Sequence, residues 1–237
     1  MYSVRGNRVQ FSMFGESHGP AIGMTIHGFP EGIAIDKDCI AAALLRRRTG
    51  GQFSSQRQED DCVEWLSGTK EREDKVLVTT GAPLTFAIYN HDHRPKDYSE
   101  LSRVVRPSHA DLPAHIKYNG HNDVSGGGMF SGRLTAVYVV AGQLCNQCLK
   151  AMGIRMNASI VQLGRLRLPM DARDYSESPT CDRRTWLESL KPEWRQLANE
   201  ILLEVQQNGD SVGGQVQLVA TGMPIGIGDP RSEERRV

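Results

Sequence analysis

The chain has 237 residues, 39% of them hydrophobic and 24% charged, and its 28 basic and 28 acidic residues give a formal net charge of zero. This composition is typical of a soluble globular protein, and the balanced charge argues against a general nucleic-acid binder. No apolar run reaches the length of a membrane-spanning helix, and the first residues lack the apolar core of a signal peptide, so we expect no membrane contact and a cytoplasmic location.

The spacing of apolar residues predicts a mixture of strands and helices. Strands bounded by turn residues are expected at residues 23–28, 62–66, 75–80, 84–89, 157–163 and 215–220. Helices are expected at residues 38–45, with Asp36 as the cap, from about 131 to 152, and around 194–205. Because their order is not a regular βαβ repeat, the expected class is α+β or layered α/β, and a Rossmann fold is disfavoured.

Residues 14–20 read Phe-Gly-Glu-Ser-His-Gly-Pro and place His18 in a turn-forming segment between glycines. Glycine removes side-chain bulk and adopts unusual backbone angles, so a histidine here can lie close to a bound ligand. Histidine is also the side chain best suited to proton transfer near neutral pH. The alternative is an ordinary histidine in a tight turn, and this segment alone leaves both interpretations open.

Arg46, Arg47 and Arg48 are consecutive at the expected end of the first helix, where they suit its negative C-terminal dipole. A guanidinium binds phosphate or carboxylate through paired hydrogen bonds, each of which contributes about 1.5–3 kcal/mol. Neighbours on a helix are about 100° apart, so at most two of the three can face one ligand. The alternative is a solvated basic helix end.

Two further segments carry candidate chemistry. Residues 106–111, Arg-Pro-Ser-His-Ala-Asp, place His109 where it can transfer a proton, bind an anion or hydrogen-bond within its own loop. Residues 126–128 are three glycines ahead of a helix, which predicts exposed backbone N–H groups and an anion or cofactor-phosphate site. The Walker lysine and the G-x-G-x-x-G spacing are missing, so ATP and NAD are disfavoured, and a flexible loop is the alternative.

The five cysteines are odd in number and lack the spacing of a disulfide framework. Cys145 and Cys148 form a single CxxC, whereas a zinc site would need two further ligands at suitable spacing. We therefore expect no metal and interpret the pair as ordinary residues of a helix surface and core, with a metal or redox role as the alternative.

Taken in order, these segments resemble the chorismate synthase family. The matching stretches are residues 14–20, 28–32, 46–50, 66–68, 79–84, 106–111, 117–118, 126–128, 209–214 and 222–228. The resemblance implies a layered β-α-β sandwich and a carbon–oxygen lyase of the shikimate pathway. Its substrate would be 5-enolpyruvylshikimate 3-phosphate, from which a 1,4-elimination releases phosphate and gives chorismate. The family needs reduced FMN without net redox change, and its members are typically homotetramers.

The resemblance also implies roles for individual residues. His18 and His109 are the expected catalytic residues, with His18 managing the proton on the reduced flavin and His109 lying near the substrate. The expected cofactor-binding residues are Arg47, toward NADP or another anion with NADPH as candidate reductant, and Met129, Phe130 and Ser131 toward FMN. The expected substrate-binding residues, toward one phosphate and two carboxylates, are Arg46, Arg48 and Arg133.

The chain departs from the family pattern at several places. Ser125 and Phe53 stand where arginines are common, and residues 129–135 read Met-Phe-Ser-Gly-Arg-Leu-Thr in place of Arg-Ser-Ser-Ala-Arg-Glu-Thr. The family also continues beyond the Gly-Ile-Gly-Asp-Pro segment. We therefore expect one domain over residues 1–228, the N-terminal two thirds of an incomplete family fold, and a non-family polar tail at 229–237 from truncation or a frameshift. The alternatives are a non-catalytic fragment and a flavin- or phosphate-binding module without lyase activity.

Overall fold

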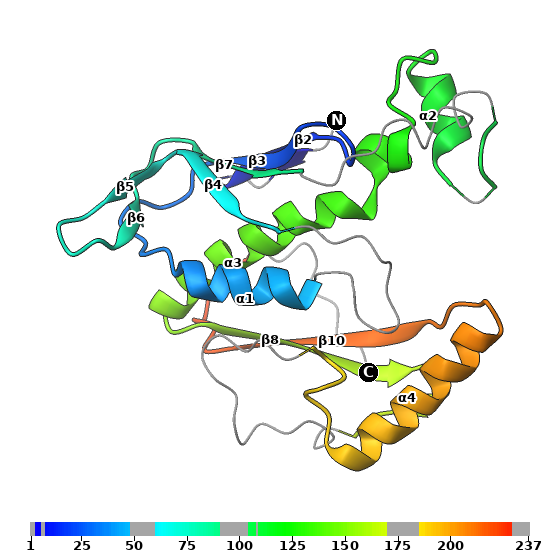
Figure 1. Cartoon of the computed structure of the whole chain (residues 1–237). Helices are drawn as coiled ribbons and strands as arrows, with labels where there is room; N and C mark the ends of the chain where they lie inside the picture. The colour runs from blue at the N-terminus through cyan, green and yellow to red at the C-terminus, as the bar shows by residue number, and fades with distance from the viewer. Residues whose placement is uncertain are drawn as a thin grey trace.

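The computed structural model describes residues 3–5, 8–47, 60–90, 104–107, 109–169 and 185–228, with the backbone alone for residues 3–5. Figure 1 shows a layered arrangement in which helices α1 and α3 lie between a sheet on one side and strands β8 and β10 on the other. Helix α4 lies near one end of β8 and β10, on the side away from α1 and α3 (Figure 1). The expected α+β class with a β-α-β layering is confirmed.

The first layer is an antiparallel sheet of five strands in the order β1-β2-β3-β7-β4. Its strands are β1 (Ser3–Arg5), β2 (Gln10–Gly15), β3 (Ala21–His27), β7 (Leu84–Tyr89) and β4 (Val63–Ser67). In β3, Ile22, Met24 and Ile26 share one face and are at most 1% exposed, because alternate side chains of a strand point to the same side. A separate two-stranded hairpin pairs β5 (Thr69–Glu71) with β6 (Leu77–Thr79).

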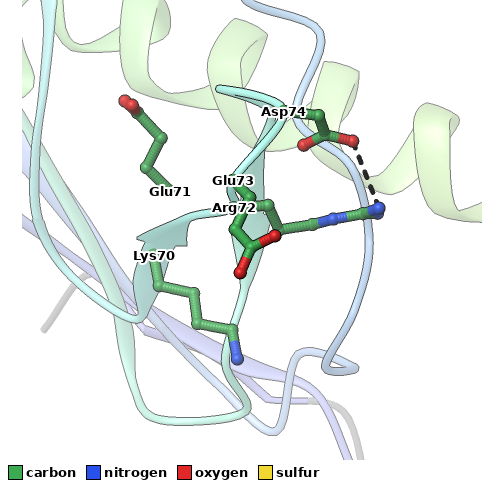
Figure 2. Close-up of a pocket in the computed structure, with 5 residues that line it drawn as sticks. All are labelled: Lys70, Glu71, Arg72, Glu73 and Asp74. Atoms are coloured by element: carbon green, nitrogen blue, oxygen red, sulfur yellow. Dashed lines mark ion pairs between the residues drawn. The ribbon is translucent and has the colours of Figure 1, made fainter.

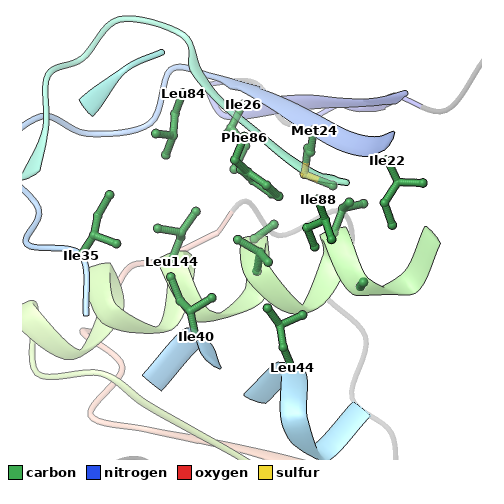
Figure 3. Close-up of a cluster of buried hydrophobic side chains, with 14 of the residues drawn as sticks. Ile22, Met24, Ile26, Ile35, Ile40, Leu44, Leu84, Phe86, Ile88 and Leu144 are labelled. Atoms are coloured by element: carbon green, nitrogen blue, oxygen red, sulfur yellow. The ribbon is translucent and has the colours of Figure 1, made fainter. Parts of the chain in front are cut away.

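Helices α1 (Lys37–Arg47) and α3 (Thr135–Ala151) form the layer against this sheet. Figure 3 shows Ile40 and Leu44 of α1 and Leu144 of α3 lying opposite the strand residues Phe86 and Met24. All five of these side chains are at most 2% exposed. Burying apolar surface in this way is the main favourable term in folding, so this layer pair is the principal core of the described chain.

The start of α1 is tied directly to α3. The Cys39 N–H donates to Asp36 Oδ1 at 2.9 Å, which confirms the predicted cap. The Gln147 side chain accepts from the Asp36 N–H at 3.0 Å and donates to the Asp36 carbonyl oxygen at 3.1 Å. Because its cap residue Asp36 is anchored on α3, helix α1 holds Arg47 in a defined place at its other end.

The second sheet has the order β10-β8-β9. Its strands are β8 (Arg155–Leu163), β9 (Leu166–Arg167) and β10 (Gly214–Thr221). Helix α4 (Pro192–Gln207) packs over one end of this sheet through a second apolar cluster. The buried members of that cluster are Leu163, Leu168, Leu190 and Ala198, with Trp186 and Trp194 packed against them.

Some elements differ from the sequence-based expectation. Strand β2 occupies part of the segment interpreted as a turn, and the short helix α2 (Asp111–Lys117) was not predicted. Pro113 is tolerated in α2 because it lies in the first turn, where its missing N–H has no helical partner to lose. The helix expected from residue 131 begins as α3 at Thr135, because η3 (Gly132–Leu134) forms a separate 3₁₀ turn before it.

The cysteines also differ from expectation at one position. Cys39 is disulfide-bonded, which the spacing of the five cysteines did not predict. Cys62, Cys145 and Cys148 are free thiols. Cys145 is exposed on α3 and Cys148 packs against the principal core, as expected for ordinary positions of a helix.

Candidate functional site

The turn that carries His18 is held by the triple-glycine segment, more than a hundred residues later in the chain. Ser17 is fully buried, and its N–H donates to the Gly128 carbonyl oxygen at 3.2 Å. Its hydroxyl lies 3.3 Å from the Ser125 carbonyl oxygen and 3.4 Å from that of Gly126. These residues belong to η2 (Ser125–Phe130), so η2 and the connection between β2 and β3 form one unit.

His18 lies directly against Gly126. A Cβ atom added at Gly126 would lie 2.5 Å from His18 Nε2 and 2.7 Å from Ser17 Oγ, and the φ angle of Gly126 is +59°. Only glycine accommodates both the contact and the left-handed backbone. By contrast, a Cβ at Gly19 would meet nothing closer than 3.5 Å. The glycine that permits the close approach to His18 is therefore Gly126 and not the neighbour in sequence.

Asn90, at the end of β7, connects this turn to Arg133. Its Nδ2 donates to the carbonyl oxygens of Gly19 at 2.8 Å and Glu16 at 3.2 Å, and its own N–H donates to the Pro20 carbonyl oxygen at 3.0 Å. Its Oδ1 accepts from Arg133 Nε at 3.1 Å. Asn90 is only 5% exposed, so these bonds are shielded from water and strong.

Two guanidinium groups share one buried carboxylate next to Asn90. Asp61 accepts from Arg47 Nη2 at 3.0 Å through Oδ2, and from Arg133 Nη1 through Oδ1. The side chains of Arg133 and Asp61 are each 4% exposed, and that of Arg47 is 18% exposed. Two cations and one anion leave a net positive charge, a combination that favours an additional anion.

Each of these arginines also keeps a buried N–H group without a hydrogen-bond partner. Arg47 Nε and Arg133 Nη2 are buried and unpartnered within the described part of the chain. An unpaired buried donor is costly, and such groups call for an explanation in a native fold. A bound phosphate or carboxylate would satisfy them, because its oxygens accept several hydrogen bonds at once.

Two carboxyl groups also lie near the His18 turn. Burial raises the pKa of Glu16, and the negative charge of Asp123 raises it further. Asp123 Oδ1 accepts from the Ser125 N–H at 2.9 Å, so Asp123 belongs to the start of η2. Glu16 therefore holds a proton to higher pH than an ordinary glutamate does.

The triple-glycine segment is not the N-terminus of α3, and that expectation is wrong. Gly126, Gly127 and Gly128 have φ angles of +59°, +91° and +53°, and α3 begins only at Thr135. Gly126 admits His18, and a Cβ at Gly128 would collide with the Asp123 carbonyl oxygen. The glycines serve close packing between segments, and the cationic groups of the site are the arginine side chains.

The three residues predicted to bind FMN lie next to this network in sequence. Met129, Phe130 and Ser131 join η2 to Arg133, and Ser131 Oγ accepts from the Arg133 N–H at 3.3 Å. Phe130 is 41% exposed, with its ring centroid 6.5 Å from that of Tyr118 after α2. The rings thereby place the α2 segment beside η2.

His109 and Arg46 lie at the surface. His109 is exposed, and its Nδ1 lies 2.8 Å from the Pro107 carbonyl oxygen within its own loop. Arg46 is exposed on α1, whereas Arg48 falls outside the described residues. The structure therefore unites His18, Arg47 and Arg133 in one network through Asp61 and Asn90.

Sequence reasoning missed Ser17, Asp61 and Asn90 as members of the site. Asp61 stands in an acidic run of residues 59–61, which ordinarily indicates a solvated surface. Asn90 follows a strand and by itself is typical of a turn. Asp61 and Asn90 each bind partners that are distant in sequence, so no local sequence pattern could predict these contacts.

A pocket elsewhere is lined by Lys70, Glu71, Arg72, Glu73 and Asp74 on the β5–β6 hairpin. Figure 2 shows these charged side chains spread around the hairpin, with Arg72 paired to Asp74 at 3.2 Å. All five residues are exposed, and an exposed ion pair contributes little. We assign this pocket no role in the site.

Across the described residues, no group of three or more His, Cys, Asp and Glu side chains could hold a metal ion. Nor does any helix in the described part of the chain have the length and apolar character needed to cross a membrane.

The ion pair between Arg106 and Asp111, at the start of α2, should make the stability of the fold depend on pH. Hydrogen bonds from Arg106 to Asp111, at 2.8 and 2.9 Å from the side chain and 3.0 Å from the backbone N–H, lower the pKa of Asp111 to about 2. The unfolded value is about 3.9, so the pair stabilises the fold above that pH and loses its effect as the pH falls toward 2. The variant Arg106→Gln should melt below the parent chain at pH 6, and the two melting temperatures should converge toward pH 2. A difference that stays constant across this range would contradict the assignment.

Comparison with known proteins identifies one family. The family model for chorismate synthase matches residues 9–236. The chorismate synthase of Aeropyrum pernix is 39% identical over 225 residues, covering 95% of this chain and 58% of the relative. That of Porphyromonas gingivalis is 40% identical over 227 residues, covering 95% and 60%. A solved structure, "Crystal Structure of Chorismate Synthase", matches with a TM-score of 0.65 and 26% identity over 92% of this chain and 59% of that one. The chain thus spans about 60% of the length of these curated relatives.

Proposed function

Because this chain belongs to the chorismate synthase family, we propose that its His18 network serves the elimination of phosphate from 5-enolpyruvylshikimate 3-phosphate to give chorismate. In this proposal the chain is a carbon–oxygen lyase of the shikimate pathway and acts in the cytoplasm as a homotetramer. The substrate carries one phosphate and two carboxylates, so it needs a site with excess positive charge.

The observation that carries the proposal is the buried pair Arg47 and Arg133 with one shared carboxylate. Its net positive charge and its two unpartnered N–H groups suit an oxyanion of the substrate or cofactor. Arg133 is already fixed by Asp61 and Asn90, so it can bind an anion without first losing rotamer freedom. Arg46 and Arg48 would add charge from the end of α1.

His18 is the proposed proton-transfer residue. It is half-buried against Gly126, and the backbone on both sides of it is held by Ser17 and Asn90. A positioned acid or base of this kind contributes about 10²–10⁴-fold in rate. We assign His109 to the substrate side of the site, because the α2 segment that follows it is placed beside η2 by Tyr118 and Phe130.

The same residues fit a flavin with a phosphate group. The unpartnered donors of Arg47 and Arg133 suit the anionic end, and the exposed ring of Phe130, with Met129 and Ser131 on either side, offers an apolar surface. Reduced FMN would supply the electron chemistry, with NADPH as its reductant. The protein residues bind and orient the substrate and hold the proton at His18.

The proposal is tested by phosphate release from 5-enolpyruvylshikimate 3-phosphate under anaerobic conditions with reduced FMN. We expect release by the chain itself and a rate about 10²–10⁴-fold lower for His18→Gln. Flavin binding without release would favour a binding module, and neither binding nor release would favour a non-catalytic fragment. Release that His18→Gln leaves unchanged would remove His18 from the mechanism.

A further inference from the structure

The amide side chain of Asn90 is hydrogen-bonded on both sides of the candidate site. Its Nδ2 donates to the carbonyl oxygens of Gly19 and Glu16, at 2.8 and 3.2 Å, and its Oδ1 accepts from Arg133 Nε at 3.1 Å. The opposite orientation would turn the amide oxygen toward two carbonyl oxygens and the amide nitrogen toward a guanidinium N–H. These partners therefore allow a single orientation of the side chain, which is buried.

The backbone that carries this amide is firmly held. Asn90 directly follows β7, a strand that pairs with β3 on one side and with β4 on the other. Its N–H donates to the Pro20 carbonyl oxygen at 3.0 Å, next to the strand pair formed by Ala21 and Tyr89. Because the backbone does not yield, a displacement of one hydrogen-bonded partner of the amide is passed to the other.

Arg133 has two of its guanidinium nitrogens bound and the third open. Nε donates to Asn90 and Nη1 to Asp61, whereas Nη2 is buried without a hydrogen-bond partner within the described part of the chain. The guanidinium is a rigid plane, so the positions of its three nitrogens are not independent. An oxyanion bound at Nη2 therefore also fixes Nε, the atom that Asn90 contacts.

His18 lies in sequence between the two residues whose carbonyl oxygens Asn90 holds. We propose that Asn90 is a positioning residue, which couples occupancy of the anion site at Arg133 to the place of the His18 imidazole. A phosphate or carboxylate oxygen at Nη2 locks the guanidinium, the guanidinium locks the amide, and the amide locks the turn that carries the ring. This inference rests on the proposed function for the roles of His18 and Arg133, and adds their coupling.

The test is histidine NMR on the full chain, with inorganic phosphate as the probe and neither flavin nor substrate present. The imidazole signal of His18 is identified by its absence from the spectrum of His18→Gln, and calorimetry gives the phosphate affinity. In the parent chain the His18 signal should shift along the phosphate-binding curve, because anion binding and ring position are linked equilibria.

The variant Asn90→Ala should keep its phosphate affinity within about tenfold of the parent, since Asp61 still holds Arg133. The phosphate-dependent shift of the His18 signal should nevertheless be lost. Asn90→Asp is the second variant, because it keeps the shape of the side chain and an acceptor for Arg133 but cannot donate to the two carbonyl oxygens. At saturating phosphate it should lose the shift as well, and circular dichroism checks that each variant is folded.

The matched control is Thr79→Val, at another buried side chain that fixes a turn. Thr79 lies on β6, and its hydroxyl donates to the Pro30 carbonyl oxygen at 2.7 Å and accepts from the Ile33 N–H at 3.0 Å. This variant should lose stability but keep the phosphate-dependent shift of His18. If it lost the shift too, the role of Asn90 would be to stabilise the fold and no more.

Three other results would overturn the proposal. They are a His18 signal that does not respond to phosphate in the parent chain, an unchanged shift in either Asn90 variant, and loss of phosphate binding in both variants, which would make the amide part of the anion site itself. The measurement involves no turnover, so a chain without lyase activity can show the coupling, and a chain that forms chorismate can lack it. Failure of this inference is therefore distinct from failure of the proposed function.

Discussion

Replacing Arg133 with methionine is expected to lower the free energy of unfolding by about 1.5–3 kcal/mol, the contribution of buried hydrogen bonds to a charged group. The change leaves the Asp61 carboxylate, whose side chain is 4% exposed, with one arginine instead of two. It also removes the donor to Asn90 Oδ1, so a buried acceptor loses its partner. Urea unfolding followed by circular dichroism measures the difference.

The matched control is Arg165→Met, because Arg165 pairs with Glu204 at 3.1 Å with side chains that are 79% and 56% exposed. Its removal should cost no more than about 1 kcal/mol. Combining Arg133→Met with Asp61→Leu should cost less than the sum of the single changes, because each single change already breaks the Arg133–Asp61 pair and the sum counts that loss twice. Additive losses, or a loss at Arg133 as small as that at Arg165, would contradict the buried network.

Gly126→Ala is expected to lower phosphate release about 10²-fold or more, close to the loss in His18→Gln, because it displaces His18, the proposed proton-transfer residue. The added methyl group would lie 2.5 Å from His18 Nε2 and 2.7 Å from Ser17 Oγ, so the imidazole must leave its position. The left-handed backbone at φ +59° adds a cost of about 1–2 kcal/mol in stability. Anaerobic release assays and thermal melts measure the two effects separately.

The variant Gly127→Ala is the control, because it introduces backbone strain without a collision with His18. Gly127 has φ +91°, and a Cβ there would meet only Ser131 Cβ at 3.9 Å. This variant should lose a similar amount of stability but keep most of its rate. If both alanine variants lowered the rate equally, the contact between Gly126 and His18 would not be the cause.

Several elements of the fold follow from local sequence. Strand β7 lies where it was predicted, at residues 84–89 after the turn at Gly81, and α1 begins directly after its predicted cap, Asp36. These features depend on side-chain period and on bonds that span three residues, so a local pattern contains them. Helix α2 was missed because it buries Asp111 and exposes Leu112 and Ile116, the reverse of an ordinary amphipathic pattern.

The candidate site was likewise predictable from the sequence only in part. The motif around His18 and the arginines at 46–48 identified the family and the type of chemistry, because residue identity and spacing are properties of the chain itself. Which arginines meet, Arg47 and Arg133, was decided by Asp61, a partner 14 residues from one and 72 from the other. The glycine that makes room for His18 is likewise Gly126, not Gly19. Sequence alone thus determined the chemical groups and the local elements that carry them. The tertiary structure alone decided their neighbours, because burial and the pairing of charges depend on segments that only folding brings together.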